Sequence, residues 1–141
     1  MRQTRTPPLI LEGIDHLLLL VRGLRPAVAF YREVLGCAIE RELREFGMVQ
    51  LRAGAALIDL VDIDSVEGQW ARPEVADGRN VDHVCIAVAE YDEHELRRHL
   101  AAHEVQIIEE GLHDGARGNS LSIYFRDPSG NTIELKGPPR G

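Results

Sequence analysis

The stretch Gly13-Ile14-Asp15-His16-Leu17-Leu18-Leu19-Leu20-Val21 returns in altered form as Asn80-Val81-Asp82-His83-Val84-Cys85-Ile86-Ala87-Val88. Each copy carries a β-branched residue, then Asp and His, and then a short apolar run that is typical of a buried strand. The two copies lie too far apart for the repeat of a solenoid. The sequence therefore predicts two copies of one larger structural unit.

A helical pattern follows each copy. In the first half, apolar residues recur at helical spacing over residues 24–35, and Gly36 is placed to end the helix as its C′ residue. In the second half, Asp92 is expected to cap a helix, with Glu95 as its capping-box partner. This second helix is expected to run to about residue 103.

Each helix is followed by three predicted strands. They span residues 37–44, 48–52 and 55–62 in the first half, and 105–110, 120–126 and 132–136 in the second. A turn-rich sequence, Asp127-Pro128-Ser129-Gly130-Asn131, joins the last two strands, and residues 111–118 are expected to form a glycine-rich loop.

Together these patterns predict an α+β fold, in which two tandem βαβββ modules form a curled mixed sheet around a trough. We expect a single domain over residues 1–141. It contains module one at residues 10–62, a linker at 63–79 and module two at 80–137.

Composition limits the class of protein. The 141 residues are 44% hydrophobic and 28% charged with a net charge of −7, which is an ordinary balance for one globular domain. No basic stripe with interleaved aromatics is present, so we expect no nucleic-acid partner. The longest apolar run, Leu17 to Val21, is too short to span a bilayer, and residues 1–8 contain no signal-peptide core. Cys37 and Cys85 are expected to be reduced core thiols. These features favour a soluble cytoplasmic protein with no membrane partner.

Two histidines and two carboxylates occupy equivalent places in the repeat. His16 and His83 lie in the first strands, and Asp59 and Glu134 lie in the last. Two curled sheets side by side would bring these positions together, and imidazoles with carboxylates suit a divalent transition metal. A histidine in a strand is more often a surface or hydrogen-bonded core residue, but the symmetry of the repeat favours a metal site at His16, His83 and Glu134. Asp59 is either a fourth ligand or a surface acid, and the sequence leaves both readings open.

Asp15 and Asp82 directly precede the two histidines. Because neighbouring side chains of a strand point to opposite faces, we expect these acids to cap backbone N–H groups away from the site. No nucleophile elbow, phosphate-binding loop or dinucleotide fingerprint is present.

The chain resembles the vicinal oxygen chelate superfamily, which includes glyoxalase I, bleomycin-resistance proteins, extradiol dioxygenases and fosfomycin-resistance enzymes. The resemblance covers about residues 10 to 137, and its motifs are Ile14-Asp15-His16, Ala29–Gly36, Val81-Asp82-His83 and Ser122–Leu135. It implies paired βαβββ modules, a homodimer, and a divalent metal (Ni, Zn, Co, Mn or Fe) held by His16, His83 and Glu134. Asp59 falls where glyoxalase I places a further Glu ligand that also transfers a proton.

The resemblance implies several functions for a small-molecule substrate. The first is a glyoxalase-like lyase or isomerase that acts on neighbouring substrate oxygens, with Glu134 or Asp59 as general base. The second is an Fe(II) extradiol-type dioxygenase, with Tyr124 and His113 as candidate acid–base groups. The third is a binding protein for resistance to a drug, which the 5% aromatic content disfavours. The fourth is a fosfomycin-type thiol transferase with the same three ligands and a similar strand at 122–125. Whether the site closes within one chain or across two is open at this stage.

Overall fold

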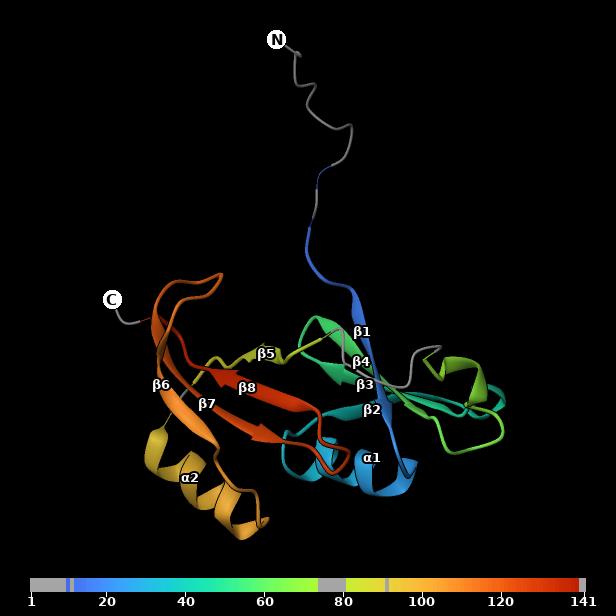
Figure 1. Ribbon diagram of the computed structural model, residues 1–141. Helices are drawn as coiled ribbons and strands as arrows, with labels where there is room; N and C mark the ends of the chain where they lie inside the picture. The colour runs from blue at the N-terminus through green and yellow to red at the C-terminus, as the bar shows by residue number, and fades with distance from the viewer. Residues whose placement is uncertain (1–9, 11, 74–80, 91, 140–141) are drawn as a thin grey trace.

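The computed structural model describes residues 10, 12–73, 81–90 and 92–139. These residues form two βαβββ modules in tandem (Figure 1), which confirms the predicted α+β class. The first module contains β1 (His16–Val21), α1 (Leu24–Glu33), β2 (Ala38–Leu43), β3 (Met48–Ala53) and β4 (Ala56–Asp62). The second contains β5 (Val84–Ala87), α2 (Glu93–Ala102), β6 (Glu109–His113), β7 (Ser120–Arg126) and β8 (Thr132–Lys136). Two short 3-10 turns, η1 (Arg44–Phe46) and η2 (Gln69–Ala71), flank strands of the first module.

Each module builds its own four-stranded mixed sheet. The strand orders are β1-β4-β3-β2 and β5-β8-β7-β6. In both sheets the first strand of the module pairs in parallel with the last, and the remaining pairs are antiparallel. The repeated Asp-His motif therefore reflects a repeated sheet topology. The strands of the described part of the chain do not form a closed barrel.

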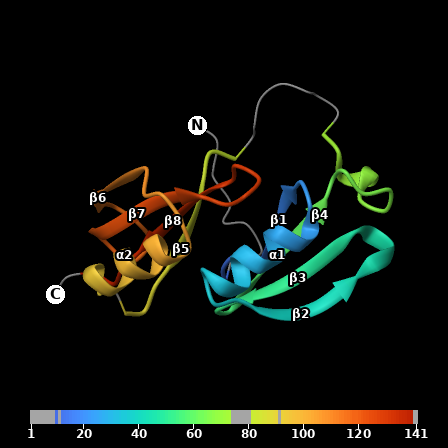
Figure 2. The same ribbon diagram turned by 90° about the horizontal axis from the view of Figure 1, so that it is seen from below.

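Each helix lies against one face of its own sheet, and both helices lie on the same side of the molecule (Figures 1 and 2). The α1 helix buries Ala27, Phe30 and Tyr31, and α2 buries Leu100. These side chains belong to one apolar cluster that includes residues of both modules. The Phe30 ring packs on that of Phe125, with centroids 6.1 Å apart. Burial of this cluster drives folding of both modules together. Neither described helix is long and apolar enough to cross a membrane.

The turn between β7 and β8 fastens the second module to the first. Within the turn, Asp127 Oδ1 accepts hydrogen bonds from the backbone N–H groups of Ser129 and Asn131 at 2.9 and 2.8 Å. Its other oxygen, Oδ2, accepts the hydroxyl of Tyr31 on α1 at 2.8 Å. The side-chain amide of Asn131 donates to the backbone carbonyl of Leu20 on β1 at 3.1 Å. The turn residues therefore order their own loop and also join the modules.

The prediction for the sixth strand was wrong by four residues. The strand runs from Glu109 to His113 rather than over 105–110, and the loop that follows is shorter than expected. Val105 and Ile107 do pack against the core, which explains their apolar pattern. However, the N–H of Val105 donates to Leu100 O at the end of α2, and the first bond to β7 is made by the N–H of Ile108 to Tyr124 O at 2.8 Å. The apolar pattern indicates which side chains are buried. In this segment the buried residues come before the residues that pair with β7.

Two finer predictions were right in part. Asp92 caps α2 and accepts from the N–H of Glu95 at 3.1 Å, as predicted, but the Glu95 side chain binds Arg98 instead of returning to the cap. Both cysteines are free; Cys37 is buried, whereas Cys85 is exposed and is not a core thiol. The predicted linker lies partly outside the described residues.

Candidate metal centre

The strand register places the histidine and the acid of each module on the same face of its sheet. Asp59 on β4 lies opposite Leu18 on β1, and Glu134 on β8 lies opposite Cys85 on β5. In both modules the acid thus pairs with the residue two positions after the histidine. Residues two apart on a strand share a face, so the two modules carry the same arrangement of groups. This face lies opposite the helices.

Each histidine ring is oriented by the aspartate that precedes it. His16 Nδ1 lies 2.6 Å from Asp15 Oδ1, and His83 Nδ1 lies 2.8 Å from Asp82 Oδ2. An ionised carboxylate only accepts hydrogen bonds, so Nδ1 carries the proton and Nε2 keeps its lone pair for a metal. The expectation that Asp15 caps a backbone group away from the site was wrong, because Asp15 precedes the regular strand and its carboxylate binds the ring of His16. The side chain can therefore turn toward its neighbour.

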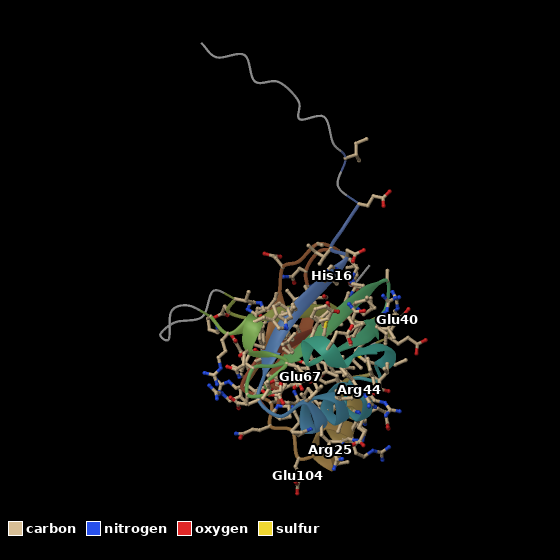
Figure 3. All side chains as sticks on the ribbon, turned by 90° about the vertical axis from the view of Figure 1, so that its right-hand side faces the viewer. His16, Arg25, Glu40, Arg44, Glu67 and Glu104 are labelled. Carbon is tan, nitrogen blue, oxygen red and sulfur yellow. The ribbon has the colours of Figure 1, made fainter. Side chains whose placement is uncertain are left out.

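The pKa of His16 is raised above its ordinary value. The hydrogen bond to Asp15 is the main cause and the negative charge of Asp59 adds to it, while partial desolvation opposes both. The negative charges of Asp15 and Asp59 therefore favour a cation at the His16 ring. Figure 3 shows His16 at the end of the first module where the chain enters β1, far from Arg25 on α1.

The second module holds a buried carboxylate at Glu134, which is only 4% exposed. His83 Nε2 lies 3.1 Å from Glu134 Oε1. Burial by itself raises the pKa of Glu134, but hydrogen bonds from Tyr124 and Ser122 and the neighbouring His83 outweigh it and hold the pKa below its ordinary value. The carboxyl group is therefore ionised at neutral pH, as a metal ligand must be.

Further polar groups surround Glu134 on this face. The Tyr124 ring lies 5.3 Å from both the His83 and the His113 rings. His113 Nδ1 lies 2.6 Å from the hydroxyl of Ser122. Burial and the hydrogen bond to Glu134 raise the pKa of Tyr124, so the phenol stays protonated and acts as a donor. The two aromatic groups proposed from the sequence as acid–base candidates therefore lie beside the site.

The first module holds a second buried carboxylate at Asp59, which is 3% exposed. Gln50, opposite it on β3, donates its side-chain amide to Asp59 Oδ2 at 3.2 Å. Asp59 Oδ1 and Gln50 Oε1 are buried and have no hydrogen-bond partner among the described residues. A buried oxygen without a donor is costly, and a cation or a ligand hydroxyl would satisfy it. Carboxylate oxygen and imidazole nitrogen are a donor set that fits a divalent metal.

One chain does not bring the four predicted ligands together. Among the residues that the structure describes, no group of three or more His, Cys, Asp or Glu side chains is close enough to hold a metal ion. The four residues therefore lie as two separate pairs, His83 with Glu134 and His16 with Asp59, each of which is a candidate half-site.

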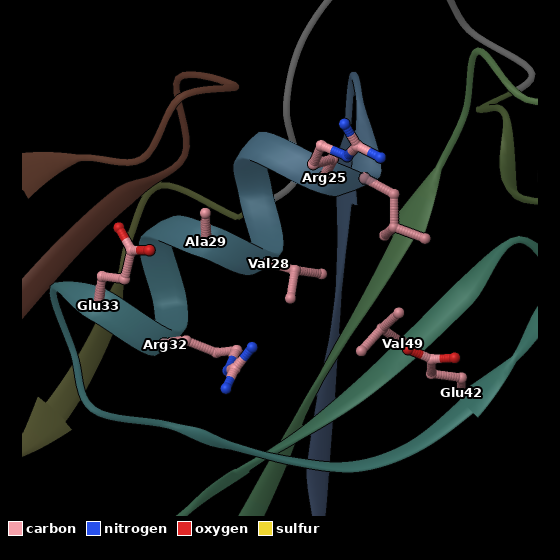
Figure 4. A pocket seen from close by; sticks show the side chains of 8 residues that line it. Arg25, Val28, Ala29, Arg32, Glu33, Glu42 and Val49 are labelled. Carbon is pink, nitrogen blue, oxygen red and sulfur yellow. The ribbon is translucent and has the colours of Figure 1, made fainter.

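A groove with a volume of about 390 Å³ lies between α1 and strands β2 and β3 (Figure 4). None of the four candidate ligands lines it. Val49 and Glu42 line it from the sheet, and Leu24 and Val28 line it from the helix. Val49 alternates with Gln50, so the groove opens on the helix side and not on the polar face. The candidate ligands therefore lie on the polar face of the sheets, and this groove lies on the opposite face.

Two sheets of identical topology each carry a histidine and an acid at equal register on the face away from the helix, so the fold is a duplicated βαβββ unit. Residues 13–135 match the family model of the Glyoxalase/Bleomycin resistance protein/Dioxygenase superfamily. The chain belongs to this superfamily, as its motifs indicated.

Curated and solved relatives extend over almost the whole chain. Virulence protein STM3117 of Salmonella typhimurium is 30% identical over 90% of this chain and 85% of its own length. Glutathione transferase FosA of Serratia marcescens is 29% identical over 89% of this chain and 81% of its own. The crystal structure of lactoylglutathione lyase from Agrobacterium tumefaciens is 25% identical with a TM-score of 0.67, and the match covers 94% of this chain and 96% of that chain. These relatives carry different activities on one fold, so the reaction must be argued from the site.

Proposed function

We propose that the protein is a divalent-metal-dependent enzyme whose active site forms between two copies of the chain. His16 and Asp59 of one copy would join His83 and Glu134 of the other. Each half-site alone offers two ligands, whereas catalytic sites for such metals use three or more protein ligands. The symmetric homodimer that supplies both halves would contain two equal sites.

We propose a lyase or isomerase reaction on a small substrate with neighbouring oxygens. A bound divalent metal would supply Lewis-acid polarisation of those oxygens. Asp59 carries the argument, because its Oδ2 is held by Gln50 while its Oδ1 has no donor among the described residues. A fixed carboxylate with a free oxygen can accept the proton of a carbon next to a carbonyl and return it to the adjacent carbon. Tyr124 meanwhile holds Glu134 ionised.

A thiol transferase is the second candidate, supported by the 29% identity to the FosA of Serratia marcescens. This reaction would rest on the three ligands His16, His83 and Glu134, and Asp59 would then be dispensable for metal binding. The two candidates therefore differ at one residue. An iron-loaded site that survives loss of Asp59 would favour the dioxygenase reading instead.

The first test is metal analysis of protein purified without chelator. About one Ni, Zn, Co or Mn per chain is expected in the wild type. Most of it should be lost in His83→Ala and kept in His103→Ala, a matched control at the C-cap of α2. Asp59→Asn separates the candidates. Metal lost in this variant, together with lost exchange of α-hydroxycarbonyl protons in D₂O, supports the lyase or isomerase. Metal retained with glutathione conjugation intact supports the transferase, and unchanged metal in His83→Ala would refute the site.

The second test asks whether the site is shared. His16→Ala and His83→Ala are unfolded together in equal amounts and refolded. In a shared site, each mixed dimer has both substitutions in one site and an intact second site. Random pairing then gives about a quarter of the wild-type metal. No recovery above the separate variants would place the complete site within one chain.

A further inference from the structure

Lys136 is the only lysine of the chain, since all other Lys/Arg positions are arginine. It is also one of the few buried charged residues, with 6% of its surface exposed. It follows Glu134 by two positions on β8 and lies opposite Ser122 on β7. Its side chain therefore starts from the same polar face as the proposed metal ligand, about 7 Å further along the strand.

The hydrogen bonds of this ammonium group go to neutral atoms. Nζ donates to the carbonyl of Gly118 at 2.8 Å and to the hydroxyl of Ser120. The Ser120 hydroxyl in turn donates to the Gly137 carbonyl at 2.7 Å. An ammonium has three N–H groups, so one remains without an acceptor in the described part of the chain. A buried charge with only neutral partners is costly and gains strongly from an anion.

Arg117 adds a second positive charge at the same place. Its guanidinium donates to the backbone carbonyls of Lys136 and Gly137, both at 3.0 Å. Neither Arg117 nor Lys136 forms an ion pair with a carboxylate of the described residues. Both cations also act on Cys85, the β5 neighbour of Glu134. There they oppose burial and the Glu134 charge, which together raise the thiol pKa to about 11.

We infer that Lys136 and Arg117 form an anion-binding subsite beside the metal ligands. The substrate then carries a carboxylate or a phosphoryl-type group in addition to its neighbouring oxygens. This inference rests on the proposed function, because it treats the polar face as the substrate site. The strand spacing between Glu134 and Lys136 is short enough for one small molecule to reach both positions.

The loop over residues 114–119 covers the lysine stem. A Cβ atom at Gly115 would lie 2.7 Å from Lys136 Cε, so the loop lies directly against the lysine side chain. An anion at Nζ accepts the N–H that has no partner among the described residues, and this charge-assisted hydrogen bond is stronger than those to the neutral Gly118 and Ser120 oxygens. The purely structural alternative is that Lys136 only ties this loop to β8.

The single lysine makes the test direct. Protein labelled with ¹⁵N-lysine has one side-chain ammonium signal, which is titrated with inorganic phosphate, acetate and chloride at constant ionic strength. A saturable shift with phosphate or acetate but not with chloride is expected, and the tighter of the two identifies the phosphoryl or the carboxylate class. A signal that no anion shifts would overturn the subsite. The titration is done on metal-free and metal-loaded protein, so its outcome is independent of the metal analysis that tests the proposed function.

Variants provide the second measurement. Phosphate or acetate is expected to raise the melting temperature of the wild type and of Arg98→Met, a control whose ion pair with Glu95 lies on α2. The increase should be lost in Lys136→Met and largely kept in Lys136→Arg. If Lys136→Met does not fold, Arg117→Met serves instead and should show a reduced increase. Equal stabilisation of all folded variants would overturn the inference.

Discussion

Replacement of Tyr31 by Phe tests how the two modules are held together. Tyr31 is fully buried, and its hydroxyl donates to Asp127 Oδ2 at 2.8 Å. Burial together with the Asp127 charge raises the pKa of Tyr31, so the hydroxyl is a permanent donor. Phe has the same shape without the hydroxyl, so the substitution removes one hydrogen bond and opens no sizeable cavity.

The expected loss follows from the partners of Asp127. Hydrogen bonds to charged groups contribute roughly 1.5–3 kcal/mol. Asp127 Oδ2 still accepts from the Asn131 side chain at 2.9 Å in the variant, so the carboxylate is not left bare. We therefore expect a value in the lower half of this range, about 2 kcal/mol of unfolding free energy. With a urea dependence of roughly 2 kcal/mol per M, the midpoint falls by about 1 M.

Urea unfolding at fixed protein concentration, followed by far-UV circular dichroism, measures the change. Asp127→Ala is the comparison and should cost more than Tyr31→Phe, because Asp127 also accepts from the backbone of Ser129 and Asn131. Metal content should be unchanged in Tyr31→Phe, since this residue lies in the core and not on the polar face. A midpoint within experimental error of the wild type would refute the reasoning that this bond joins the modules.

Three further predictions concern the half-sites. Because Asp15 raises the pKa of His16, the imidazole of metal-free protein should titrate above its ordinary 6.5 in NMR, and Asp15→Asn should lower the midpoint. The pKa of Glu134 is lowered from 4.5, so its ionisation stabilises the fold above this pH; the stability gap between metal-free wild type and Glu134→Gln should shrink as urea unfolding is repeated at falling pH. Cys85, whose pKa of about 11 is raised by burial and by Glu134 from 9.0, should react with iodoacetamide at pH 8 about 100-fold more slowly than an ordinary thiol. Glu134→Gln should speed this reaction, and an unchanged rate would contradict the charge effect.

Much of the fold could be predicted from local sequence signals. The strands at 120–126 and 132–136 match to the residue, because their flanks carry strong turn residues such as Asp127 and Gly130. The β6 strand was misplaced because Val105 and Ile107 carry the apolar pattern without the ladder bonds. A sequence pattern indicates which side chains are buried. The bounds of a strand depend on where its backbone forms hydrogen bonds with a neighbouring strand, which the pattern does not contain.

The sequence predicted only those candidate site residues that occupy equivalent positions in the two halves of the chain. Comparison of the halves singled out His16, His83, Asp59 and Glu134, and the register places them at equivalent points. The role of Gln50 had no sequence signal, because it depends on the antiparallel register of β3 with β4. Lys136 did have one, as the sole lysine of the chain, but its burial could not be inferred from composition.

The charges of Asp59 and Glu134 support the proposal that the site is assembled from two chains. A complete site would place Asp59 and Glu134, both nearly fully buried, next to each other. Two carboxylates at close range repel strongly in a poorly solvated place, so a chain that enclosed both would be destabilised until a cation arrived. With one carboxylate in each module, a chain can fold at the smaller cost of single buried atoms without a hydrogen-bond partner, such as Asp59 Oδ1. In the proposed shared site, assembly would be coupled to association and to the cation, because whatever binds only the assembled state stabilises it.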